Sequence, residues 1–301
     1  ERDFGWLDTV LGLLHDGGIG VDLATPVASP PPWLGRRYPG SLPVTAEGTV
    51  LYPGSRNHFC PSSPDYHRAA AAITTDLVAR YARHPAVRMW HVGNEYGQVC
   101  WCDRTAEAFR AWLRARHGDL AELNRAWGTS FWSQAYAEWD EILPPRAAPY
   151  LVNPGQELDF KRFGSDALRA CYREQAAIIR AAHPAAIVTT NLMGFFPGVD
   201  AWSWADDLDV PANDVYLDPA DPLGHVDVAM AHDLTRGLGS RGAGTDRPWM
   251  LMEHATGAVN WRDHNVAKPA GRILLDALQA VARGAAAVCY FQWRQSRFGA
   301  E

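Results

Sequence analysis

The chain has few cysteines, no long apolar run and no excess of positive charge, and each shortage excludes a class of protein. Five cysteines among 301 residues are too few, and odd in number, for a disulfide scaffold, and they suit a reducing compartment. No run of 18 apolar residues could cross a bilayer. The net charge of −6, without a basic stripe, disfavours nucleic acid as a partner. We therefore expect a cytoplasmic protein that binds neither membrane nor nucleic acid.

A glycine-rich phosphate loop is also missing, although helical patterns alternate with short apolar runs. Helices are expected at 6–16, 66–83, 165–182, 227–238 and 269–283, and strands at 19–25, 87–92, 187–193, 208–216, 249–253 and 286–293. Gly or Pro just beyond most of these helices is the usual stop signal. The alternation predicts an α/β fold with parallel strands and helical crossovers, and the lack of a phosphate loop disfavours a doubly wound nucleotide-binding sheet.

The connections differ in length on the two sides of the predicted sheet. Helix-to-strand connections are short, whereas strand-to-helix connections such as 26–64 and 94–104 are long and rich in Trp, Pro, Asn, Asp and Glu. Long loops that follow the strands and carry many polar and aromatic residues are typical of the active face of a (β/α)-barrel. The sequence therefore predicts a TIM-barrel type of (β/α)8 fold, of which six strands can be counted.

Two glutamates follow apolar runs directly. The run 87–92 leads into Asn94 and Glu95, and the run 249–252 ends in Glu253. A carboxylate at the end of a buried strand is costly unless it is solvated or used chemically, although a plain surface position remains the alternative. Two carboxylates on one barrel rim suit glycosidic cleavage, in which one protonates the leaving oxygen and the other attacks or activates water.

Further motifs extend over nearly the whole chain. They include the segments 24–26, 30–34, 57–61, 127–132, 190–196, 259–262 and 291–296. Together with the two glutamates, these segments resemble glycoside hydrolase family 42, the β-galactosidases. The resemblance implies a barrel in which the acid/base follows strand four and the nucleophile follows strand seven.

The resemblance also assigns roles to particular residues. It implies that Glu95 is the general acid/base, that Asn94 contacts the sugar 2-hydroxyl, and that Glu253 is the nucleophile. It places Trp132 and Trp261 in the walls of the galactose pocket, although core packing is the alternative for both.

Three positions bear on how galactose would be held. Glu301 matches a residue that accepts a hydrogen bond from a galactose hydroxyl. Gly93 replaces a more usual Asp, and the segment 209–216 departs from the family's Ser-Trp-Asp-Asn-Tyr pattern. These two departures leave strict galactose specificity open.

Three of the cysteines form a third group of interest. Cys60, with Cys100 and Cys102, resembles the zinc cluster of part of this family, whose fourth Cys would fall near Thr105. Structural zinc normally takes four Cys or His ligands, so this set lacks one. Nearby candidates to complete it are Asp103, His58 and His67. The alternative is three buried thiols without a metal.

The expected activity follows from the resemblance. It implies a retaining glycoside hydrolase that releases terminal β-D-galactosyl residues by double displacement through a covalent glycosyl-enzyme, without a catalytic cofactor. Its substrate would be a galactoside or oligosaccharide, and the full-length form would be a homo-oligomer, in this family often a trimer. Two alternatives remain, namely another two-glutamate glycosidase, such as an α-L-arabinopyranosidase or β-glucosidase, and a non-catalytic sugar-binding barrel.

The number of strands gives one more expectation. Since Glu95 follows the second strand and Glu253 the fifth, the family register makes the six strands numbers three to eight. We expect residues 1–301 to be a single, incomplete barrel domain, without its N-terminal β/α units and any C-terminal accessory domains.

Overall fold

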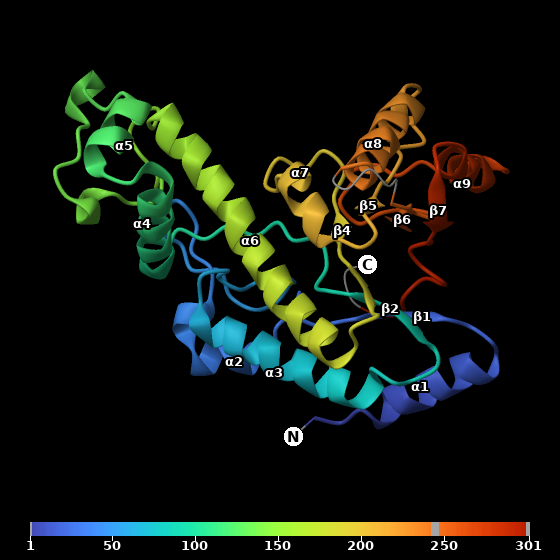
Figure 1. Cartoon of the computed structure of the whole chain (residues 1–301). Helices are drawn as coiled ribbons and strands as arrows, with labels where there is room; N and C mark the ends of the chain where they lie inside the picture. The colour runs from blue at the N-terminus through green and yellow to red at the C-terminus, as the bar shows by residue number, and fades with distance from the viewer. Residues whose placement is uncertain (1, 242–246, 299–301) are drawn as a thin grey trace.

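The computed structural model describes residues 2–241 and 247–298 (Figure 1). The strands are β1 (Val21–Ala24), β2 (Val87–His91), β3 (Ile187–Thr189), β4 (Asn191–Leu192), β5 (Ala212–Asp214), β6 (Trp249–Glu253) and β7 (Ala285–Val288). The α-helices are α1 (Gly5–Asp16), α2 (Pro32–Arg37), α3 (Pro64–Tyr81), α4 (Asp103–His117), α5 (Leu120–Trp127), α6 (Pro154–Ala182), α7 (Ala201–Trp204), α8 (Gly224–Gly239) and α9 (Arg272–Ala282). In Figure 1, α1 and α3 lie below the strands, and α8 and α9 lie above them. None of the described helices is both long and apolar enough to cross a membrane.

All strand pairs are parallel and follow the order of the chain. One sheet runs β1-β2-β3 and the other β4-β5-β6-β7, with Thr190 alone between β3 and β4. Neighbouring strands in chain order, joined by helical crossovers, are the arrangement of a (β/α)-barrel wall. The fold predicted from the alternation is thus confirmed, and the six expected strands are present, with the third interrupted at Thr190.

The expected strand at 208–216 is shorter than predicted. Only Ala212–Asp214 pairs as a strand. Just before it, the carboxylate of Asp209 accepts a hydrogen bond from the backbone N–H of Val188 at 2.8 Å. At this point a carboxylate, and not a backbone carbonyl, accepts the hydrogen bond from the neighbouring strand β3. A pattern of apolar residues in the sequence cannot predict such a substitution.

The predicted helices are present, but α6 begins much earlier than expected. Asn153 accepts hydrogen bonds from the backbone N–H groups of Gly155 and Gln156, and Pro154 occupies the first turn, which together start the helix. The helix then continues for 29 residues. The first half of α6 packs against α4 and α5. The pattern of alternating strands and helices did not predict these two helices.

The helices α4 and α5 pack on the first half of α6 around a core of their own. Its buried residues are Phe109, Leu113, Leu123, Trp127, Ile142, Phe160 and Phe163. At its edge the buried Asp159 accepts hydrogen bonds from Trp127 at 2.9 Å and from His117 at 2.8 Å. This helical layer stands to one side of the strands in Figure 1.

The two outermost strands each have one partner in the described part of the chain. There β1 pairs only with β2, and β7 pairs only with β6. The helices beside these edges expose large apolar side chains, namely Trp6, Val10 and Leu13 on α1 and Leu274, Leu275, Leu278 and Val281 on α9. Unpaired strand edges and exposed apolar faces of this kind are normally covered in a folded protein.

The carboxylate oxygens of Asp22, on β1, are buried without a compensating donor among the described residues. No described residue offers a hydrogen-bond partner to either carboxylate oxygen, and burial raises the pKa of Asp22 from 3.8 to about 7. An acid with a raised folded-state pKa binds its proton more tightly in the folded chain. Its ionisation therefore lowers stability progressively as the pH rises from about 4 to about 7.

We expect Asp22→Asn to remove this loss of stability. The free energy of unfolding of the variant minus that of the wild type should increase from pH 4 to pH 8, by at most about 4 kcal/mol. Urea denaturation at several pH values measures this difference. His232 and His254, whose pKa values burial lowers to about 4, titrate in both proteins and cancel. Asp16→Asn, on the exposed end of α1, is the control, and equal pH dependence in all three proteins would contradict the prediction.

Candidate active site

The acidic residues of the site stand where parallel strands end. Asp214 is the last residue of β5, Glu253 is the last residue of β6, and Glu95 lies four residues beyond β2. One carboxylate oxygen from each of the three lies within 4.8 Å of the others. The structure therefore brings Glu95 and Glu253 together on one rim, the face that carries the active site in barrels of this kind.

The backbone around Glu95 adopts an unusual turn. Gly93 and Glu95 have positive φ angles of 67° and 42°. A Cβ on Gly93 would lie 2.7 Å from the Tyr96 ring, so a side chain there would force the turn to move. The turn is fixed by hydrogen bonds from the Gly93 N–H to Thr25 Oγ1 and from the Glu95 N–H to Asn191 Oδ1, both at 2.9 Å.

Each of the two glutamates has its own polar partners. Arg56 Nη2 lies 2.5 Å from Glu95 Oε2. The Tyr216 hydroxyl donates to Glu253 Oε2, and burial with this hydrogen bond raises the pKa of Tyr216. The surroundings of Asn94 favour the orientation in which its oxygen accepts from Arg56 Nη1 at 3.0 Å and its nitrogen donates to Glu253 Oε1 at 3.3 Å.

Asn191, fully buried at the start of β4, connects the whole site. Its oxygen accepts from the Glu95 backbone and from His91 Nε2, each at 2.9 Å. Its nitrogen donates to Asp214 Oδ2 at 2.6 Å and to Glu253 Oε1 at 3.2 Å. One amide thus contacts all three acidic residues. Its oxygen requires a proton on His91 Nε2, and because burial lowers the pKa of His91, that residue is neutral with its proton on Nε2.

The Trp261 ring borders a cleft beside Glu253. It meets the Tyr216 ring edge-on with centroids 4.8 Å apart, and the cleft of about 230 Å³ also involves Ala255, Phe291 and Gln295. Trp261 is 57% exposed, so core packing, the alternative for this residue, is excluded.

The other expected pocket residues have different outcomes. Trp132 is 66% exposed and packs against Phe131 with centroids 4.7 Å apart, which excludes core packing for it as well. Glu301 lies outside the described residues. The contribution of both residues to a sugar pocket stays a prediction.

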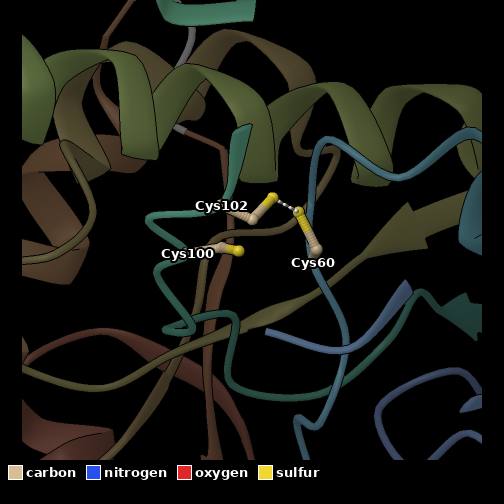
Figure 2. Close-up of side chains that lie close together, drawn as sticks. All are labelled: Cys60, Cys100 and Cys102. Carbon is tan, nitrogen blue, oxygen red and sulfur yellow. Dashed lines mark hydrogen bonds between the residues drawn. The ribbon is translucent and has the colours of Figure 1, made fainter. Parts of the chain in front are cut away.

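The three cysteines expected to converge do so (Figure 2). The sulfurs of Cys60, Cys100 and Cys102 lie within 4.8 Å of one another, and those of Cys60 and Cys102 are 3.7 Å apart. The Thr105 hydroxyl lies 3.4 Å from both of these sulfurs. Hydrogen bonds from Cys100, Cys60 and Thr105 hold the pKa of Cys102 well below its ordinary value, whereas the pKa values of Cys60 and Cys100 are raised.

Four residues of the site were not anticipated as functional. Arg56, Asn191, Asp214 and Tyr216 all make contacts within it. Asn191 and Asp214 did carry a local signal, because each is a polar residue inside or at the end of an apolar run. Arg56 lies in the long loop before α3, 39 residues before Glu95 in the chain, and its contact with Glu95 had no such local signal.

A parallel (β/α)-barrel wall with two glutamates together at its carboxyl-end rim defines a glycoside hydrolase type of barrel. Comparison with known families agrees, because the model of glycoside hydrolase family 42, described as β-galactosidase, matches residues 1–301. The chain belongs to this family.

Individual relatives are similar over the whole chain. A β-galactosidase of an Arthrobacter species is 53% identical over 306 residues, covering 100% of this chain and 43% of that protein. One from Heyndrickxia coagulans is 45% identical, covering 99% of this chain and 44% of the relative. The crystal structure of the β-galactosidase from Bacillus circulans sp. alkalophilus superposes with a TM-score of 0.93 at 41% identity, covering 100% of this chain and 44% of that one. The chain therefore spans less than half the length of these relatives.

Proposed function

We propose that this chain forms the catalytic barrel of a retaining β-galactosidase that releases terminal β-D-galactosyl residues. The observation that carries the proposal is the closeness of Glu95 and Glu253, since one carboxylate oxygen of Glu95 lies within 4.8 Å of one of Glu253. Retaining glycosidases hold their two carboxyl groups about 5–5.5 Å apart, whereas inverting enzymes need about 6.5–9.5 Å to admit a water. The short separation favours direct attack on the sugar. The family and its relatives support galactose as the sugar.

In this mechanism Glu253 attacks the anomeric carbon while Glu95 protonates the departing oxygen. Glu95 then takes a proton from water, which releases the sugar from Glu253. Tyr216 and Asn191 donate to the two oxygens of Glu253 and so hold the carboxylate in a fixed orientation. Because Glu253 stays ionised in such a setting, it is the better nucleophile of the two.

Substrate contacts are proposed for the residues around this pair. Asn94 lies between Arg56 and Glu253, where its amide would reach a hydroxyl beside the anomeric carbon. The exposed faces of Trp261 and Trp132 are suited to stacking against the apolar face of a sugar ring. Glu301 is proposed as an acceptor for a galactose hydroxyl on the family resemblance alone.

A panel of nitrophenyl glycosides tests the proposal. We expect the β-D-galactoside to be hydrolysed with the highest kcat/KM, with β-galactose as the first product by NMR. Faster hydrolysis of the α-L-arabinopyranoside or β-glucoside would assign a different sugar to the same mechanism. Binding of galactose without turnover of any glycoside would instead identify a sugar-binding barrel.

The open edges of the barrel wall support a proposal on its organisation. The exposed apolar faces of α1 and α9 and the unpaired sides of β1 and β7 are suited to further β/α units that close the barrel. We therefore interpret the six strands as numbers three to eight of an eight-stranded barrel. A trimeric assembly and a cytoplasmic location remain predictions, which sedimentation analysis and cell fractionation would test.

A structural zinc ion is proposed for the cysteine cluster. Zinc–sulfur bonds of about 2.3 Å in a tetrahedron place two sulfurs about 3.8 Å apart. The Cys60 and Cys102 sulfurs, at 3.7 Å, already have this spacing, and Cys100 converges on them. The three thiolates would hold the ion, which when bound would join the loop before α3 to the loop before α4. Thr105 stands beside the cluster in place of a fourth thiolate.

We expect purified protein to contain about one zinc per chain. Cys102→Ser should abolish metal binding and lower the melting temperature, because binding of structural zinc contributes to folding. Cys289→Ser, outside the cluster, is the control and should retain the metal. Elemental analysis and thermal denaturation with and without a chelator measure both effects. A metal-free wild-type protein whose melting temperature does not change with added zinc would contradict the proposal.

A further inference from the structure

Asp214 is the third acid of the site, and the two-carboxylate mechanism does not use it. Its side chain is buried, with an exposed fraction of 5% for the residue. One oxygen, Oδ2, accepts from Asn191 Nδ2 at 2.6 Å. The other, Oδ1, is buried, and no described residue offers it a hydrogen-bond donor.

The carboxyl group of Asp214 faces that of Glu95, with one oxygen of each within 4.8 Å of the other, and a hydrogen bond between the two side chains contributes to the raised pKa of Asp214. Two ionised carboxylates are both acceptors, so this contact forms a hydrogen bond only if one of them carries a proton. When two carboxyl groups lie close together in a buried site, repulsion between their charges raises the pKa of one of them, so that this group stays protonated. The Glu95–Asp214 pair therefore holds at least one proton, and whenever Glu95 is ionised, as it is after it has protonated a leaving group, that proton is on Asp214.

The surroundings of the three acids indicate which one keeps that proton. Glu95 has the guanidinium of Arg56 at 2.5 Å, which favours its ionised form. Glu253 receives hydrogen bonds from Asn191 and Tyr216 on its two oxygens. Asp214 has a single amide donor and no described cation within ion-pair distance. Its own charge would be the least compensated of the three.

We propose that Asp214 is a protonated positioning residue, whose carboxyl O–H donates to Glu95 and holds that side chain in place for proton transfer to the glycosidic oxygen. Oδ2 accepts from Asn191 while the Oδ1 hydroxyl faces Glu95, so both oxygens are satisfied. The proton stays on Asp214 throughout, since Glu95 exchanges its own proton with leaving group and water. The role in catalysis rests on the function proposed above, whereas the protonation does not.

The electrostatic surroundings agree with a neutral Asp214. Burial and then the charges of Glu253 and Glu95 raise the pKa of Asp214 well above its ordinary value. The other titratable groups facing it are Tyr216 and, from the chain after β7, Cys289. Neither is a cation that would stabilise an ionised Asp214. A charged Asp214 would also oppose ionisation of the nucleophile Glu253.

Infrared difference spectroscopy on the purified protein tests the protonation directly. At pH 7 the spectrum of wild type minus Asp214→Asn should contain the carbonyl band of one protonated carboxyl group. Asp218→Asn, a half-exposed acid four residues away, is the matched control and should not change that band. A difference spectrum with only a carboxylate band would overturn the proposal.

Kinetics tests the positioning role. Asp214→Ala removes the donor, and we expect kcat for a poor leaving group to fall about 100-fold, since a misplaced catalytic group costs about that much. Asp214→Asn retains an N–H donor of the same shape, so its kcat should be at least about tenfold higher than that of the Ala variant. Equal losses in both folded variants would overturn the role. If the wild type hydrolysed no glycoside, only the proposed function would fail, because the infrared measurement needs no substrate.

Discussion

Glu253→Gly should reduce kcat on nitrophenyl β-galactoside by at least about four orders of magnitude. Glu253 is the carboxylate whose oxygens are held by Asn191 and Tyr216, so it presents an ionised oxygen to the anomeric carbon. Removing it leaves a space that a small anion can enter. Added azide should therefore restore part of the activity and give a galactosyl azide of inverted, α configuration.

The fold of this variant should be unchanged, because Glu253 ends β6 and its loss removes no apolar core group. Circular dichroism and the melting temperature provide that control. A variant with near-normal turnover, or rescue with a β-galactosyl azide, would show that another residue is the nucleophile.

Glu95→Ala should produce a loss that depends on the leaving group. General acid catalysis contributes about 10²–10⁴-fold, and it matters most when the departing oxygen is a poor leaving group. We expect a large fall in kcat/KM for lactose and a much smaller one for dinitrophenyl galactoside. The enzyme should then accumulate as the glycosyl intermediate, since water activation is also lost. Azide should release that intermediate as the β-galactosyl azide.

The position of Glu95 makes this prediction specific. The backbone of Glu95 has a positive φ angle and its N–H donates to Asn191. The position of the Glu95 side chain is therefore set by the conformation of the turn. Glu95→Gln, which keeps the shape and can still contact Arg56 and Asp214, is the matched variant. It should show the same dependence on leaving group, and equal losses on both substrates in both variants would assign Glu95 a binding role instead.

Much of the fold was predictable because its signals are local. Apolar runs and helix stop signals near Gly17 and Gly284 placed the strands and most helices, and the six-strand order followed from their alternation. The helix α4 has an amphipathic pattern with buried Ala106, Phe109 and Leu113, yet it was missed because it lies within a long strand-to-helix connection. The early start of α6 was missed for the related reason that its first half packs on α4 and α5 rather than on the barrel.

The sequence by itself determined that Glu95 and Glu253 follow buried strands, because an apolar run and the acid after it are neighbours along the chain. Only the tertiary structure decided how those ends meet. Asn191 bonds to Glu95, Asp214 and Glu253 and to His91, which lies 100 residues earlier in the chain, and Arg56 reaches Glu95 from a separate loop. Hydrogen bonds act over about 3 Å between specific atoms. Such contacts exist only after the parallel strands have brought those atoms to one rim.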